Sequence, residues 1–223
     1  MDGVKDEKPT RRYRSAVREE SARRTRRAVV GAAAELFVTR GYAGTSLADV
    51  AVAAGVARPT VFAAFGSKPA LLRQVLDEAL AGDDEPVPVA QRPWFRPVFE
   101  ADTQASVLDA YAGVCTLISS RAARIFETVR RAADNAPEVT EVWETLLRNR
   151  RAGSRMVVEK VQAFGALRQG SDVERAVDVL WIFNDPALYD SLVRHCGWTE
   201  DAFRAWLSER MRDALLVPDP PMN

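Results

Sequence analysis

Cysteine and histidine are scarce in this chain of 223 residues, which has two cysteines, Cys115 and Cys196, and one histidine, His195. Two cysteines exclude a disulfide-rich scaffold, and a single histidine excludes a metal site built from several Cys and His ligands. Most histidine-based catalysis is excluded for the same reason. We therefore expect no metal, no cofactor and no enzyme active site. His195 is expected near a helix C-terminus, where the helix dipole favours a positive charge.

Long hydrophobic runs are also missing from the sequence. No stretch approaches the length of about 18 uninterrupted apolar residues that a membrane span requires. The first fourteen residues, MDGVKDEKPTRRYR, have no apolar centre and do not read as a secretory signal. Hydrophobic residues still make up 47% of the chain and charged residues 28%, which suffices for a packed core. We expect a cytoplasmic protein with no membrane partner.

Alternating strand patterns are absent as well, and apolar residues recur at helical spacing along the chain, which predicts an all-α fold. The N-terminal third has several short helical segments. Ser46 and Asp49 have the spacing of a capping box that opens a helix ending at Gly55. A second short helix is expected over 58–65, after only a short link. Two short helices joined by a glycine turn are typical of a helix-turn-helix, although any compact helical bundle with short loops fits the same periodicity.

The zero net charge of the chain, 31 basic against 31 acidic residues, conceals an uneven distribution. Residues 1–73 contain fourteen basic and seven acidic side chains, so this part carries +7 and the remainder −7. Such asymmetry suggests a module that binds a polyanion, joined to a second part of different character.

The block from Thr25 to Leu72 resembles the TetR family of bacterial transcription regulators. Its sequence is TRRAVVGAAAELFVTRGYAGTSLADVAVAAGVARPTVFAAFGSKPALL, and the resemblance rests on Ala33-x-x-Leu36-Phe37, Arg40-Gly41-Tyr42, Thr45-Ser46-Leu47, Asp49-Val50-Ala51, Ala54-Gly55-Val56, Thr60-Val61-Phe62, Phe65-Gly66-Ser67-Lys68 and Leu71-Leu72. The resemblance implies an N-terminal three-helix DNA-binding domain and a larger C-terminal helical domain. It also implies a bacterial homodimer that binds a near-palindromic operator, associates with the nucleoid, and is released by an unknown small-molecule effector, most often as a repressor.

Five segments are expected on this basis. They are a flexible basic arm over 1–20, a helix-turn-helix domain over 21–68, a connecting helix over 69–82, an effector-binding and dimerisation domain over 83–217, and a disordered tail over 218–223.

The resemblance places DNA contacts in and around the recognition helix. The candidates are Thr25, Thr45, Arg58, Pro59, Thr60, Phe62, Ala63 and Lys68. Arg58 is suited to read guanine through two hydrogen bonds, or to bind a phosphate. Thr25 and Thr45 are expected at helix starts, either facing phosphates or acting as caps, and Lys68 is expected to reach a phosphate beside a helix N-terminus.

The recognition helix departs from the family in being poor in hydrogen-bonding groups. Phe62 stands where many members have tyrosine, and Ala63 and Ala64 offer only methyl contacts. DNA shape and the basic arm are therefore expected to contribute to binding. The arginines of the arm and of the stretch that follows it either contact DNA or are solvated charges; they are Arg11, Arg12, Arg14, Arg23, Arg24, Arg26 and Arg27.

The C-terminal part is expected to hold the effector pocket and the dimer interface. The candidate pocket residues are Tyr111, Cys115, Trp143, Trp181 and Asn184, although aromatic residues at helical spacing more often form core. The candidate interface residues are Val177, Leu180, Leu188, Leu192, Phe203, Leu207, Met211 and Leu215, whose alternative role is to close the core of their own protomer. An enzyme, and an interaction module that has lost DNA binding, are the competing functions.

Overall fold

The computed structural model describes residues 11–168 and 172–217, and side chains from residue 18 onward. Within these residues the chain is all-α, apart from one isolated bridge between Leu167 and Leu216. By its internal contacts the chain divides into residues 1–71 and 72–223, here called the N-terminal and C-terminal units. The expected contributions of residues 1–10 and 218–223 lie outside the described residues.

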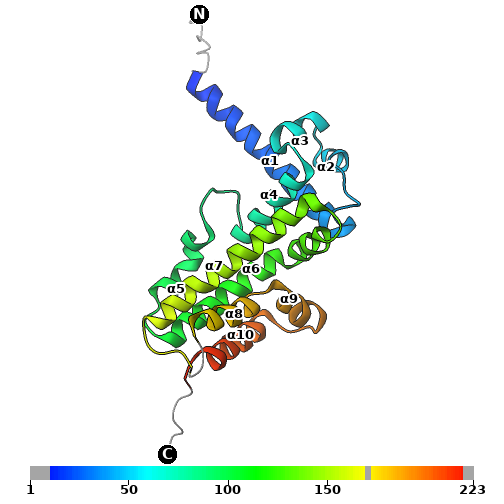
Figure 1. The fold of residues 1–223 in the computed structure, drawn as a ribbon. Helices are drawn as coiled ribbons and strands as arrows, with labels where there is room; N and C mark the ends of the chain where they lie inside the picture. Colours follow the sequence, from blue (N-terminus) through cyan, green and yellow to red (C-terminus); the bar gives the residue numbers. More distant parts are fainter. Residues whose placement is uncertain (1–10, 169–171, 218–223) are drawn as a thin grey trace, which may run out of the picture. The chain divides into compact units, whose positions relative to one another are not determined.

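The N-terminal unit contains three helices, α1 (Arg11–Arg40), α2 (Leu47–Ala54) and α3 (Arg58–Phe65) (Figure 1). Helix α1 packs against α2, and α2 packs against α3. Fully buried side chains of this unit include Val29, Ala33, Phe37, Val50, Val61 and, at the start of the following helix, Leu71. The sequence places the start of α1 near Ser21, but the helix begins at Arg11, because a charged stretch with few apolar residues gives no periodicity from which to locate a helix start.

Local hydrogen bonds fix both ends of α2. The Ser46 hydroxyl accepts from the Asp49 N–H, and the Asp49 carboxylate accepts from the Ser46 N–H, which completes the predicted capping box. These hydrogen bonds hold the pKa of Asp49 below its usual value. At the other end, Gly55 adopts a φ of 66°, a left-handed conformation that glycine takes without strain. The chain can therefore turn at once into α3.

Helix α4 (Lys68–Ala81) is continuous across the boundary between the two units. The C-terminal unit is built on two long helices, α6 (Gln104–Ala133) and α7 (Pro137–Gln162), which lie side by side (Figure 1). The shorter helices are α5 (Arg96–Glu100), α8 (Val173–Phe183), α9 (Pro186–Tyr189) and α10 (Glu200–Leu215).

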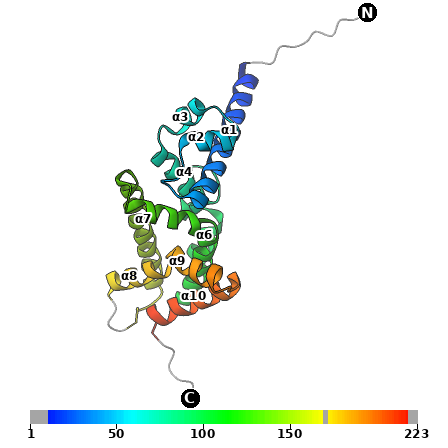
Figure 2. The ribbon, with the colours of Figure 1, turned by 90° about the vertical axis from the view of Figure 1, so that its right-hand side faces the viewer.

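The last three helices gather at one end of the α6–α7 pair, with α8 against α7 and both α9 and α10 against α6 (Figure 2). The break between α8 and α9 falls at Asn184-Asp185-Pro186, as the proline predicts. A π-helical turn, Asp190–His195, follows α9, so His195 lies at the end of a helical segment.

No single helix in the described part of the chain is long and apolar enough to cross a membrane. The pair α2 and α3 passes that test together by length and composition only, and it is bent by 112°.

Replacing Ser46 with alanine is expected to destabilise the N-terminal unit by about 1 kcal/mol, because the Asp49 N–H then loses the hydroxyl that caps it. Hydrogen exchange of the α2 amides and urea unfolding measure this change. Thr39→Ala is a suitable control, since its hydroxyl only bonds to the Glu35 carbonyl within α1. Equal effects of the two substitutions would show that the capping box does not hold α2.

Candidate nucleic-acid interface and ligand cavity

One face of α3 is open to solvent, and this face carries most of the predicted recognition residues. Val61 is the only buried residue of the helix. Arg58, Pro59, Thr60, Phe62 and Ala63 are all exposed, and 63% of Phe62 is accessible. Among the described residues, no hydrogen bond or ion pair engages the side chain of Arg58. The bend of 112° between α2 and α3 lies within the range of helix-turn-helix motifs.

Arg26 on α1 holds the far end of α3 in place. Its Nη1 donates to the Ala64 carbonyl over 2.9 Å, and its guanidinium lies 4.6 Å from the centre of the Phe65 ring. Arg26 is one of the arginines predicted either to contact DNA or to be solvated. In the structure it is exposed and also holds the end of α3, a tertiary contact for which sequence periodicity offers no signal.

The two threonines predicted to face phosphates lie in other positions. Thr25 is in the interior of α1, where its hydroxyl donates to the Ser21 carbonyl, so it does not start a helix. Thr45 is only 2% exposed, and its hydroxyl donates to the carbonyls of Leu36 and Gly41. Since Ser46 is the N-cap of α2, Thr45 instead fastens the α1–α2 turn to the core.

Lys68 stands at the first position of α4, as predicted, but its ammonium is already engaged. It donates to the Tyr42 carbonyl over 3.0 Å and lies 4.0 Å from the centre of the Tyr42 ring. An ammonium has three donor hydrogens, so one bond to Tyr42 leaves others for a phosphate. The side chain is half-buried, which fixes its charge near the helix N-terminus.

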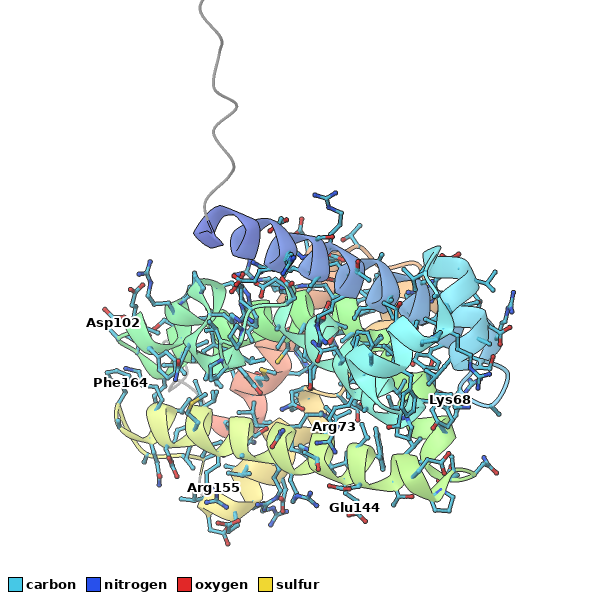
Figure 3. All side chains as sticks on the ribbon, turned by 90° about the horizontal axis from the view of Figure 1, so that it is seen from above. Lys68, Arg73, Asp102, Glu144, Arg155 and Phe164 are labelled. Carbon is cyan, nitrogen blue, oxygen red and sulfur yellow. The ribbon has the colours of Figure 1, made fainter. Side chains whose placement is uncertain are left out.

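The C-terminal unit has an open-sided cavity of about 940 Å³, near the upper end of the volumes typical of small-molecule sites. Its walls come from the second half of α4, the segment 83–92, α6, α7 and the α8–α9 break. The apolar lining residues include Leu76, Phe95, Val114, Ile118, Phe126, Leu146 and Met156. Figure 3 shows Glu144 and Arg155 on the side of α7 that faces away from α6, so the opposite side of α7 is the one available to the cavity.

A polar cluster forms one wall of this cavity and joins three helices. The Asn184 amide nitrogen donates to the Tyr111 hydroxyl over 3.0 Å and to the Ser154 hydroxyl over 2.9 Å. The Asn184 carbonyl oxygen accepts from Nε of Arg150 over 3.0 Å. Burial raises the pKa of Tyr111 far above its usual value and raises that of Cys115 to about 12. Both groups therefore stay protonated, and the cluster contains one fixed charge, Arg150.

Arg150 is held from several sides, with only 10% of its side chain exposed. Nη2 donates to the Trp181 carbonyl over 3.0 Å and lies 3.3 Å from a carboxylate oxygen of Asp185. The guanidinium carbon lies 5.2 Å from the centre of the Phe126 ring and 5.4 Å from that of Trp181. Nη1 is buried and has no hydrogen-bond partner among the described residues.

Three of the five predicted pocket residues line the cavity: Tyr111, Cys115 and Asn184. The rings of Trp143 and Trp181 are not among its lining residues. Trp143 packs against the outer edge of Phe126. Arg150 is not among the residues predicted from the sequence, although it lies four residues from both Leu146 and Ser154, on the buried stripe of α7. A charged residue at an inward-facing position of the helix is the signal that could have found it.

The segment 83–92 is fixed by an arginine of its own. Arg92 is 5% exposed, and its Nη1 donates to both carboxylate oxygens of Asp83 over 2.7 Å. Nη2 donates to the Glu85 carbonyl. The backbone N–H of Glu85 and the Arg92 side chain together lower the pKa of Asp83. These contacts tie the two ends of the segment together, although Nε of Arg92 is buried without a hydrogen-bond partner among the described residues.

Most of the residues predicted to face a second protomer are buried within their own unit. Six of them, Val177, Leu180, Phe203, Leu207, Met211 and Leu215, are at most 1% exposed. They pack with α6 and α7 in one hydrophobic core, which is the alternative role given for them above. Only Leu188 and Leu192 keep part of their surface exposed. Helical periodicity identifies the inward face but does not say which element covers it.

No group of three His, Cys, Asp or Glu side chains that could hold a metal ion occurs within residues the structure describes.

Comparison with known proteins bears on both units. Residues 29–75 match the family model of bacterial regulatory proteins of the tetR family. The structure is similar to that of NalD of Pseudomonas aeruginosa, the secondary repressor of the MexAB-OprM multidrug efflux pump, with 21% identity, a TM-score of 0.68, and coverage of 87% of this chain and 98% of that one. No curated protein matches the chain.

Two further solved structures share the fold at lower identity. A transcriptional regulator from Saccharomonospora viridis, solved in complex with choline, has 17% identity and a TM-score of 0.66, with coverage of 86% and 98%. A TetR-family regulator from Rhodococcus sp. has 16% identity and a TM-score of 0.64, with the same coverage of both chains.

Replacing Asn184 with leucine is expected to lower the free energy of unfolding by about 2 kcal/mol or more, because buried hydroxyl and guanidinium groups lose their partners. Urea unfolding followed by circular dichroism measures the loss. Asn149→Leu, on the exposed surface of α7 at the cavity mouth, is the matched control and is expected to change stability by less than about 0.5 kcal/mol. Similar values for both variants would contradict the role given to Asn184.

The two cysteines are expected to differ in reactivity. Cys196 is exposed, whereas Cys115 is buried with its pKa raised to about 12, and the thiolate is the reactive form. An aromatic disulfide reagent should therefore titrate one thiol rapidly in the native protein and two in denaturant. Cys196→Ser should abolish the rapid reaction, and Cys115→Ser should leave it unchanged. Rapid reaction of both thiols in the native chain would mean that the cluster around Cys115 is open.

Proposed function

We propose that this chain, a TetR-family transcriptional regulator, binds a near-palindromic operator in double-stranded DNA as a homodimer and acts as a repressor that a small-molecule effector releases. The family consists of DNA-binding regulators and not of enzymes. The observation that carries the proposal is the open face of α3, which presents Arg58, Thr60 and Phe62 away from the core. We place the protein in the bacterial cytoplasm.

We propose that the N-terminal unit binds DNA and that the C-terminal unit binds the effector. Arg58 reads a base edge in the major groove, and Phe62 and Ala63 make apolar contacts, for which the thymine methyl group is suited. Lys68 and the N-terminus of α4 bind a phosphate and fix the register. The cavity of the C-terminal unit supports the effector site because it has apolar walls and a few convergent polar groups.

We expect helix α4 to couple effector binding to DNA binding. Its first residue, Lys68, bonds to the N-terminal unit, and its second half lines the cavity. At its C-terminus, the Ala81 carbonyl accepts from Nη1 of Arg121 on α6 over 3.2 Å. A ligand that displaces the cavity end of a hydrogen-bonded helix moves the other end with it, because the helix shifts as a rod.

Selection of bound fragments from the host genome is the experiment that tests DNA binding, and it supplies the operator for the measurements below. The selected fragments should share a near-palindrome with half-sites about 34–36 Å, one helical turn, or a multiple apart. Light scattering at micromolar concentration should give twice the mass of the chain. Enrichment of no sequence, together with salt-independent binding, would favour an interaction module in place of a regulator.

Arg58→Ala is expected to weaken binding to the selected operator by roughly tenfold or more, since a bidentate contact to guanine discriminates by about 1–3 kcal/mol. Binding to unrelated duplex should fall far less. Fluorescence anisotropy with both duplexes measures the two affinities. Arg124→Ala, an exposed arginine of α6, is the control and should change neither. Equal losses on both duplexes would assign Arg58 to a phosphate.

A further inference from the structure

We infer that the cavity takes an organic carboxylate with an apolar body, and that Arg150 is the residue that binds the carboxylate. This inference rests on the proposed function, because it specifies the chemical class of the effector.

Arg150 has hydrogen-bond donors that its neighbours do not use. A guanidinium offers five N–H donors. Nε binds Asn184, and Nη2 binds Trp181 and lies near Asp185, but Nη1 has no acceptor among the described residues. A buried donor without a partner costs free energy, more so when it is charged. Arg150 lines the cavity, and an anionic acceptor from a ligand would remove this cost once a small shift of the neighbouring side chains uncovers Nη1. Because Nε and Nη2 are occupied, a carboxylate would bind through Nη1 in a charge-assisted hydrogen bond.

The positive charge of Arg150 is weakly compensated by its neighbours. The nearest counterion, Asp185, makes a single contact of 3.3 Å, and its side chain is 34% exposed, so water screens part of its charge. Arg150 itself is only 10% exposed. In contrast, Arg92 receives both oxygens of Asp83 at 2.7 Å. Asp83 is itself 46% exposed, so the two buried arginines of the cavity wall differ in their contacts and not in screening: Arg150 has one carboxylate contact at 3.3 Å, whereas Arg92 has two at 2.7 Å.

Aromatic and apolar side chains surround the guanidinium of Arg150. Phe126 and Trp181 contact it with their rings, and they exclude water from its vicinity. Tyr111, whose hydroxyl is kept protonated, lies in the same cluster and lines the cavity. The remaining walls are mainly apolar. A ligand of this site therefore needs an anionic end for Arg150 and an apolar body for the rest of the cavity.

The cavity mouth carries the opposite sign. Asp77, Glu78, Asp84 and Glu85 line it, together with Arg73. A cationic ligand is thus the competing class. Two of these carboxylates already have partners: Arg73 offsets part of the charge of Asp77, and Glu78 accepts from Gln74. The mouth is also more exposed than Arg150, so its charges are more strongly screened.

Three probes with one alkyl chain separate these classes: decanoate, decanol and decyltrimethylammonium. Binding to the full chain is measured by tryptophan fluorescence and by the shift in melting temperature. Decanoate should bind about tenfold or more tightly than decanol, since a hydrogen bond to a charged group contributes roughly that preference. The inference is overturned if decanoate binds no better than decanol, if the ammonium probe binds most tightly, or if none of the three binds.

Two substitutions assign the preference to Arg150. Arg150→Met should remove the advantage of decanoate over decanol while decanol binding changes by less than about threefold, since methionine keeps the apolar stem. Arg150→Lys retains the positive charge but not the planar guanidinium, so it should keep part of the preference for decanoate over decanol. It also provides a second test of the assignment if Arg150→Met does not fold. The matched control is Arg148→Met, two residues away on α7 with 64% of its side chain exposed. A full preference in folded Arg150→Met would overturn the assignment.

Operator release distinguishes this inference from the proposed function. If decanol or the ammonium probe releases the operator and decanoate does not, the regulator stands and the carboxylate class is wrong. If decanoate binds through Arg150 and the chain binds no specific DNA, the ligand class stands and the regulatory role is wrong.

Discussion

The C-terminal unit depends on one constraint: a polar cluster buried in a helical core must satisfy its hydrogen bonds internally. The Asn184 side chain meets this requirement for most of the cluster, because it donates to Tyr111 on α6 and Ser154 on α7 and accepts from Arg150; among the described residues, Nη1 of Arg150 is left without a partner. Its own position is set by the break at Pro186, which ends α8 where the amide can turn inward. The meeting point of α6, α7 and α8, and with it one wall of the cavity, is thereby fixed.

The N-terminal unit meets the opposite requirement, which is to keep one helix almost free of internal contacts. Helix α3 contributes a single buried residue, Val61, and its end is secured by a hydrogen bond from Arg26 to a backbone carbonyl. Because the fixing contacts come from Val61, the turn at Gly55 and Arg26, the outer side chains of α3 are not needed for stability. They are therefore available for a partner, and a recognition helix rich in alanine is structurally tolerable.

How far the sequence predicts the structure depends on the range of the interactions involved. The start and end of α2 follow from Ser46, Asp49 and Gly55, whose partners lie within four residues, and these predictions are confirmed. Thr45 looks equally local, but its hydroxyl bonds to Leu36 across the turn, and no sequence pattern shows this. Arg150 and the buried positions of α8 and α10 belong to the same class. Helical periodicity predicts that the apolar residues of α8 and α10 face inward, and it predicts nothing for a charged residue such as Arg150. Which elements these side chains contact is determined by tertiary packing.

The uneven charge of the chain acquires a physical meaning from the two units. Fourteen basic residues accumulate in residues 1–73, the part that carries α3 and that we propose binds DNA. Within the remainder, which carries −7, one arginine is buried beneath aromatic rings with an unused Nη1. An acidic exterior lowers the affinity for DNA over the surface of this unit. It would also slow the entry of an organic anion, so the selectivity for a carboxylate must come from contact with Arg150 inside the cavity and not from long-range attraction.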